Sequence, residues 1–160
     1  MMKITVIAVG KLKEPYWQQA TKEYLKRLTR YGKVNVTEIE EEKLPEDASD
    51  AQIVQALERE AQKILAKTPA SSYHIALCIE GRQMNSVAFS SCLQDIAIYK
   101  NSEVTFMVGG SYGLADTIKK KADLLLSFSP MTFPHHMARA MLLEQLYRAL
   151  GLQNGTKYHK

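Results

Sequence analysis

Three residues at the end of the chain could act together on a substrate that carries bases and phosphates. Tyr158, His159 and Lys160 supply an aromatic ring for stacking, an imidazole for proton transfer and a cation that attracts phosphate. Terminal segments fray by default, however. The tail is therefore interpreted either as a functional unit or as a disordered end.

A second candidate group lies about twenty residues earlier, in a stretch with helical periodicity. His135 and Arg139 are four residues apart and project into one apolar arc of the predicted helix. Burying a guanidinium without a partner is costly. Either the arc faces another subunit or a ligand cleft, or Arg139 is paired with a carboxylate in the core. A symmetric dimer built on this helix would place any neighbouring ligand loops beside its interface.

Three loops could hold a ligand, and each follows an apolar run. Glycine allows backbone groups to approach a ligand closely, and ligands of open α/β sheets lie outside the carboxyl ends of the strands. Neither a dinucleotide-binding nor a P-loop motif is present, and a glycine turn by itself is often only conformational. Together the three loops indicate a nucleotide-like cofactor held largely by backbone atoms. Their sequences are Glu80-Gly81-Arg82, Gly109-Gly110-Ser111-Tyr112-Gly113 and Ser129-Pro130-Met131-Thr132-Phe133-Pro134.

The elements that must position these loops alternate along the chain. Apolar runs alternating with helical patterns predict crossover units on a mostly parallel sheet, an α/β fold. Strands are predicted at Lys3 to Val9, Val34 to Ile39, Tyr73 to Ile79, Glu103 to Val108 and Leu124 to Phe128. Helices are predicted at Pro15 to Tyr31, Asp50 to Ala66, Ser86 to Lys100, Leu114 to Ala122 and Pro134 to Leu150.

Several details follow from the same patterns. The third and fourth strands are apolar at almost every position, which predicts a central place in the sheet. Asp50 and Ser86 are the predicted N-caps of their helices. The first helix carries an apolar stripe and, on its other side, a basic stripe of Lys22, Lys26 and Arg30. Without repeats or a Pro/Gly-rich linker, residues 1 to 160 are interpreted as a single domain.

Composition narrows the class of protein. The chain has 160 residues, of which 46% are hydrophobic and 24% charged, values typical of a globular domain. Its apolar runs are far shorter than the roughly 20 residues that cross a bilayer, and the N-terminus is interpreted as a strand rather than a signal peptide. Cys78 and Cys92 show no metal-ligand spacing. We therefore expect no membrane span and no metal, a cytoplasmic location, and cysteines packed in the core.

Charge is distributed unevenly along the chain. Residues 1–33 carry eight basic and two acidic side chains, residues 34–110 carry six and twelve, and residues 111–160 carry seven and three. One interpretation is that the basic ends meet around a polyanion while the acidic middle faces away. The other is a set of ordinary solvated faces.

The joint pattern resembles a known family. The stretches Lys3 to Lys13, Gly109 to Gly113, Leu126 to His135, Glu144 to Ala149 and Tyr158 to Lys160 closely resemble the RlmH family, the 23S ribosomal RNA pseudouridine N3-methyltransferases of the SPOUT class. The resemblance extends over essentially the whole chain. By comparison with the family pattern, Met1 resembles one extra residue before the usual first residue of these proteins.

This resemblance implies a fold, a cofactor and a substrate. The fold would be a SPOUT-type parallel sheet flanked by helices, with a C-terminal trefoil knot, and the active form a homodimer. S-adenosyl-L-methionine would bind in the knot, and the substrate would be a pseudouridine of 23S rRNA within the ribosome. Carried over from the family, the cofactor contacts fall on Leu77, Gly109, Phe128, Ser129, Pro130, Met131, Thr132 and Phe133.

Catalytic roles are hypotheses within that resemblance. The N3 proton must leave before or during methyl transfer, so a base with a pKa near 7 or a cationic group would promote the reaction. We expect His159 or His135 to take the proton, Arg139 to stabilise charge and Tyr158 to stack on the base. The alternatives are a methyltransferase acting on another RNA, such as tRNA, and a ribosome assembly factor without catalysis.

Overall fold

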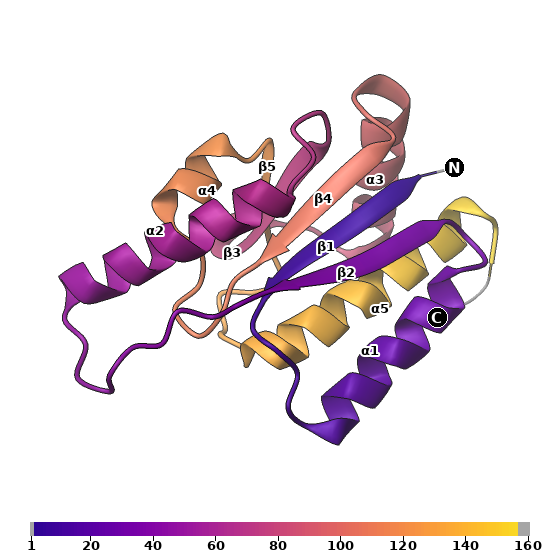
Figure 1. Ribbon diagram of the computed structural model, residues 1–160. Coiled ribbons are helices and arrows are strands. Elements are labelled where there is room, and N and C mark those ends of the chain that lie inside the picture. The colour runs from indigo at the N-terminus through magenta and orange to yellow at the C-terminus, as the bar shows by residue number, and fades with distance from the viewer. Residues whose placement is uncertain (1, 157–160) are drawn as a thin grey trace.

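Five parallel strands form one sheet in the order β2-β1-β4-β3-β5 (Figure 1). The structure is a computed structural model that describes residues 2–156. The strands are β1 (Lys3–Val9), β2 (Lys33–Ile39), β3 (Tyr73–Gln83), β4 (Glu103–Val108) and β5 (Leu124–Ser127). The helices are α1 (Pro15–Leu28), α2 (Asp50–Lys67), α3 (Ser86–Tyr99), α4 (Asp116–Lys121) and α5 (His135–Gln153).

The predicted α/β architecture with a parallel sheet is confirmed. All five predicted strands and all five predicted helices are present, and β1 and β4 have the predicted bounds. The central position of β4 is also confirmed, and β3 lies beside it. β1 is an interior strand as well, with every residue after Lys3 buried, because helices cover both faces of the sheet.

The helices form two layers (Figure 1). Helices α2 and α4 cover one face, over a core that includes Ile7, Ile64, Met107 and Ile118. Helices α1, α3 and α5 cover the other face, over a larger core that includes Leu28, Phe89, Phe106 and Leu143. Within this second layer α5 packs against both α1 and α3. The apolar arc predicted on α5 therefore faces the core of its own chain.

Local signals set where the helices begin. Pro15 occupies the first turn of α1, where its missing N–H costs nothing. The N-caps of α2 and α3 are Ser49 and Asn85, so the prediction of Asp50 and Ser86 is wrong by one residue in each case. Ser49 and Gln52 form a reciprocal capping box, which satisfies two backbone N–H groups at once and outcompetes a single Asp cap.

Strand β3 is longer than predicted and irregular. Leu126 of β5 pairs first with Leu77 and then with Arg82, so the intervening residues bulge out of the ladder. Gly81 makes the return possible, because a Cβ on it would lie 2.6 Å from the Leu126 carbonyl carbon. The bulge carries Cys78, Ile79 and Glu80 beyond the sheet edge, toward the loops that follow β4 and β5.

No helix among residues 2–156 is long and apolar enough to cross a membrane. Cys78 and Cys92 are free thiols, and both are only half-buried. Cys92 packs against the core as predicted, whereas the predicted core packing of Cys78 is wrong because the bulge of β3 carries it out of the ladder.

Candidate functional site

A cavity of about 360 Å³ opens at the carboxyl ends of β3, β4 and β5. Parallel strands bring their carboxyl ends to one edge of the sheet, so three loops far apart in sequence meet there. The walls come from the β3 bulge, the glycine loop after β4 and the segment between β5 and α5. The lining residues include Leu77 to Glu80, Val108 to Leu114, Lys119, Ser127 to Ser129, Met131 to Phe133, His135 and Ala138.

The glycine loop is closed on itself. The Gly113 N–H donates to the Gly110 carbonyl at 3.0 Å, and Gly113 has a φ of 81°, a conformation that favours glycine. A Cβ on Gly109 would overlap the Gly113 carbonyl group. This turn therefore requires glycine at both positions, and it presents backbone rather than side chain to the cavity.

Serine hydroxyls brace the loop between β5 and α5. The Ser129 N–H donates to Ser127 Oγ at 3.2 Å, and the Met131 N–H donates to Ser129 Oγ at 3.0 Å. Met131 and Phe133 have large apolar side chains and are nevertheless 73% and 38% exposed, and Tyr112 of the facing loop is 50% exposed. The opening of the cavity thus carries a rim of uncovered large apolar and aromatic side chains.

An ion pair spans the cavity wall. Lys119 Nζ lies 2.6 Å from Glu80 Oε1, and this hydrogen bond holds the pKa of the Glu80 carboxyl below its usual value. Sequence reasoning placed Glu80 in a candidate ligand loop but did not select it as a site residue, and it did not single out Lys119. Tyr112 of the glycine loop was also not chosen, although its place in that loop was a usable signal.

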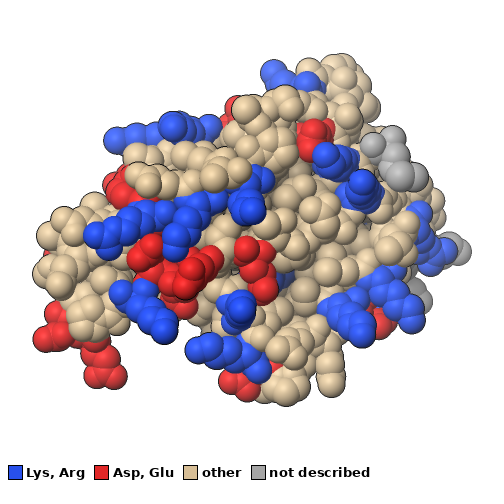
Figure 2. Space-filling model, in the orientation of Figure 1, with Lys and Arg blue, Asp and Glu red and all other residues tan. Residues whose placement is uncertain are grey.

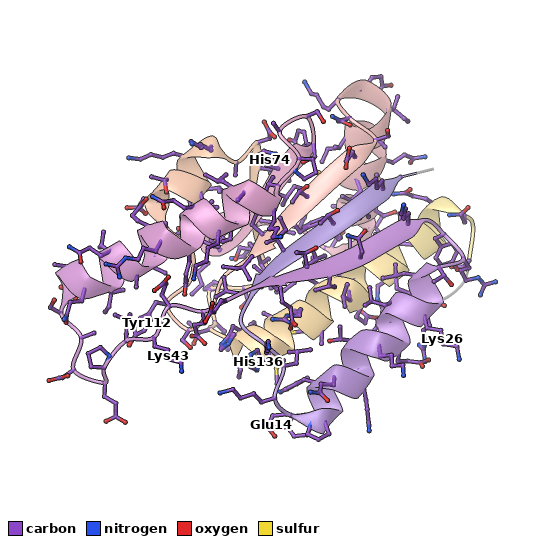
Figure 3. The ribbon with its side chains drawn as sticks, in the orientation of Figure 1. Glu14, Lys26, Lys43, His74, Tyr112 and His136 are labelled. Carbon is purple, nitrogen blue, oxygen red and sulfur yellow. The ribbon has the colours of Figure 1, made fainter. Side chains whose placement is uncertain are left out.

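Two neighbouring histidines lie at the start of α5. Their ring centroids are 4.1 Å apart; His135 lines the cavity, and His136 lies beside it on the first turn (Figure 3). Burial lowers the pKa of His135, and the nearby charges of His136 and Arg139 lower it further, against the carboxylate of Glu41. The lowered pKa keeps the imidazole in its neutral, proton-accepting form at pH 7.

Arg139 is paired inside the protein. Its side chain is 1% exposed, its Nη1 lies 2.5 Å from Glu38 Oε2, and its Nη2 donates to the Gly10 carbonyl at 2.9 Å. Of the two alternatives left open by the sequence, the structure shows the one with a carboxylate partner. The guanidinium lies outside the cavity wall and joins α5 to the carboxyl ends of β1 and β2.

The acidic segment after β2 lies beside the site. A Cβ on Gly110 would lie 3.6 Å from Glu41 Oε1, and one on Gly10 would lie 3.6 Å from Glu41 Oε2. The neighbouring Glu42 is held by the Lys63 ammonium at 2.8 Å. Part of the acidic middle of the chain therefore lies next to the glycine loop of the cavity.

The structure brings most of the predicted site residues together. Of the predicted cofactor contacts, all but Pro130 line the cavity. His135 lines it too, whereas Arg139 lies behind its wall. Tyr158 and His159 lie outside the described residues. Among residues 2–156, no three His, Cys, Asp or Glu side chains are grouped so that they could hold a metal ion.

A parallel α/β sheet with a loop-lined cavity at the carboxyl ends of its strands is the architecture of cofactor-binding α/β proteins. The family described as "Predicted SPOUT methyltransferase" matches residues 2–159, and the chain belongs to this family.

Relatives of nearly the same length are similar over almost the whole chain. The ribosomal RNA large subunit methyltransferase H of Streptococcus sanguinis is 47% identical over 99% of this chain and 100% of its own. Proteins with the same name from Leuconostoc mesenteroides and Listeria welshimeri are 48% and 45% identical, with the same coverage.

Solved structures share the fold. A probable methylase family protein from Haemophilus influenzae superimposes with a TM-score of 0.54 at 15% identity, over 100% of this chain and 72% of that one. A probable methyltransferase from Bordetella pertussis gives a TM-score of 0.53 at 13% identity, over 93% of this chain and 96% of that one.

Proposed function

We propose that this protein transfers a methyl group from S-adenosyl-L-methionine to N3 of a pseudouridine in 23S rRNA, with the assembled ribosome in the cytoplasm as its target. The observation that carries the proposal is the loop-lined cavity in a chain that is 45 to 48% identical, over 99% of its length, to ribosomal RNA large subunit methyltransferases.

The cavity fits a cofactor of this kind. Leu77 and Phe128 offer apolar surface for a purine ring, and the glycine loop at Gly109 offers closely approachable backbone. The Glu80 and Lys119 side chains supply a carboxylate and an ammonium for the ends of an amino acid. We assign the contacts to Leu77, Gly109 and Phe128 to Phe133, with Pro130 stiffening its segment from outside the wall. When bound, S-adenosyl-L-methionine supplies an electrophilic methyl group.

The chain's own residues would position the base and remove its proton. His135, neutral at pH 7 and in the cavity wall, can accept the N3 proton, and His159 of the tail is the second candidate. Arg139 adds positive charge from behind the wall, where it already lowers the pKa of His135. Tyr158 would stack on the base. Transfer then needs only alignment of the deprotonated nitrogen with the methyl group.

The proposal includes the arrangement of the chain. Residues 1–160 act as one domain, the segment from β5 through α5 completes a trefoil knot, and two copies form a homodimer. Membership in the SPOUT family supports all three. The uncovered rim formed by Tyr112, Met131 and Phe133 is consistent with a second surface closing over the opening.

Transfer of labelled methyl by purified protein tests the function. Assembled ribosomes, free 23S rRNA and tRNA are compared, and the modified nucleoside is identified by mass spectrometry. Label on a 23S pseudouridine, strongest with ribosomes, is the expected result. Label on tRNA instead would identify another RNA as substrate, and cofactor-independent ribosome binding without transfer would indicate an assembly factor.

A further inference from the structure

The outer face of α1 carries cations at helical spacing. Lys22 and Lys26 are four residues apart on α1 and exposed, and the exposed Arg30 follows at the same spacing in the turn after the helix ends at Leu28. The opposite side of the helix buries Thr21 and Leu28. Figure 2 shows Lys and Arg side chains gathered over the position of α1, and Figure 3 shows Lys26 on its outer side. The core therefore needs this helix but does not need these charges.

The row of cations continues to the site. Lys13, in the loop before α1, is exposed, and its charge acts on the His136 imidazole. The Gln18 side chain donates from Nε2 to the Leu12 carbonyl at 2.7 Å and so fixes this loop to the helix. We call Lys13, Lys22, Lys26 and Arg30 the α1 basic row. It starts beside the histidines and follows α1 away from the cavity.

These four cations have no carboxylate partner among the described residues. The one acid on the same stretch of the helix, Glu23, is bound by Arg27 at 2.9 Å. On the other face of the sheet, Lys63 and Lys119 are paired with glutamates, whereas the exposed Lys67, Lys120 and Lys121 have no carboxylate partner in the described structure. The positive potential is thus left uncompensated along α1.

We propose that the α1 basic row binds the phosphate backbone of the RNA strand that leads away from the target nucleotide. The inference rests on the proposed function and names the surface that recruits its substrate. The 14 residues of α1 extend about 21 Å at 1.5 Å per residue, which is long enough to lie along several successive phosphates of one strand. Lysine and arginine contacts of this kind position a backbone without reading sequence.

The test replaces three cations of the row in the triple variant K22Q/K26Q/R30Q. Glutamine keeps the helix propensity close to that of lysine and arginine, so the fold is retained. The matched control K67Q/K120Q/K121Q removes the same charge from α2 and α4, on the opposite face of the sheet, at exposed positions without a carboxylate partner in the described structure. Methyl transfer to ribosomes is measured against salt concentration, with S-adenosyl-L-methionine affinity and oligomeric state in parallel.

We expect the row variant to raise KM for ribosomes roughly 10-fold or more at moderate salt and to reduce the slope of log KM against log salt by about 2, because fewer counterions are released. Its kcat and cofactor affinity should equal those of the wild type, and the control should behave as wild type. An unchanged KM, an equal effect in the control, or an altered oligomeric state would each overturn the proposal.

A direct binding measurement separates this inference from the proposed function. Affinity for a 23S rRNA fragment is measured without cofactor, for the wild type and both variants. If the wild type transfers no methyl but the row variant alone loses RNA affinity, the proposed function fails and the binding surface stands. If both variants bind RNA as the wild type does while transfer is intact, the surface fails and the function stands.

Discussion

At the scale of single residues, the protonation of His135 decides what the cavity can do. Its ring shares the start of α5 with His136, and burial together with the charges of His136 and Arg139 lowers its pKa below the ordinary 6.5. A neutral imidazole in a cavity wall can accept a proton, whereas an imidazolium cannot. The Glu41 carboxylate raises the pKa of His135 and so opposes this effect. The acidic segment after β2 therefore influences the protonation of His135 from outside the cavity wall.

We predict that His135→Asn lowers kcat/KM for ribosomes about 100-fold, the lower range for loss of a general base, with cofactor affinity little changed. His136→Asn is the matched control, because it changes the neighbouring ring outside the cavity lining. Initial rates across pH check the role. Wild-type kcat/KM should fall on the acid side only below pH 6.5, and a His135→Asn variant with the same rate and pH profile would rule His135 out as the base.

The same histidines link stability to pH. Their pKa values are lowered in the folded protein, so the unfolded chain binds more protons at pH values between the folded and unfolded pKa. We predict that the free energy of unfolding decreases as pH falls from about 6.5 through the folded values. Urea titrations at several pH values measure it. The double variant H135N/H136N should lose stability less steeply over this range, and an equal slope would contradict the linkage.

At the scale of elements, the turn after β4 determines the shape of the cavity. Gly109 and Gly113 come so close that a methyl group between them cannot be accommodated. We predict that Gly109→Ala lowers affinity for S-adenosyl-L-methionine at least 10-fold while the chain still folds. Gly155→Ala is the control, since nothing lies within 4 Å of its Cβ position, although its φ of 72° adds some strain of its own. Calorimetric titration distinguishes the two, and full affinity in Gly109→Ala would remove this loop from the cofactor site.

The link between α5 and the sheet is a second element-level feature. Replacing Glu38 leaves the Arg139 guanidinium buried without its carboxylate, whereas replacing Arg139 leaves a carboxylate that is 38% exposed and can be solvated. We predict that Glu38→Gln costs about 3 kcal/mol of stability and that Arg139→Met added to it restores part of the loss. Denaturant unfolding of the two single variants and the double variant checks this. Additive losses would show that the two side chains act independently.

Some of these elements could be predicted from sequence and others could not. The bounds of β1 and β4 were predicted correctly because both strands are apolar on both faces. The apolar run of the sequence therefore ends where the strand ends. The capping residues were misplaced because Asp50 and Ser86 are as suitable by type as Ser49 and Asn85. The capping box decides for α2, and the hydrogen bond from the Ala88 N–H to the Asn85 side chain decides for α3. The Arg139 and Glu38 pair spans 101 residues, and no local pattern reveals such a contact. The cavity loops could be predicted because a ligand of an α/β sheet lies at the carboxyl ends of the strands. This rule can be applied without knowing the order of the strands in the sheet.

At the scale of the whole molecule, the tail and the cavity have separate tasks in the proposed reaction. We predict that deleting Tyr158 to Lys160 abolishes methyl transfer to ribosomes while affinity for S-adenosyl-L-methionine stays within about 3-fold of wild type, because the cavity lies in the body of the fold. Single-turnover transfer and cofactor titration measure the two properties. Replacing the same three residues by alanine controls for chain length. Normal transfer by the shortened protein would remove the tail from catalysis.

The position of α5 between α1 and α3 has a consequence for how the protein is made. Both neighbours leave the ribosomal exit tunnel before α5 does. Until α5 follows, the apolar side chains that it covers stay uncovered, among them Leu28 and Phe89. The nascent chain must therefore carry an open hydrophobic layer until α5 has been made and has packed between α1 and α3. An mRNA cut short within α5 would yield a product that proteases recognise by this open layer.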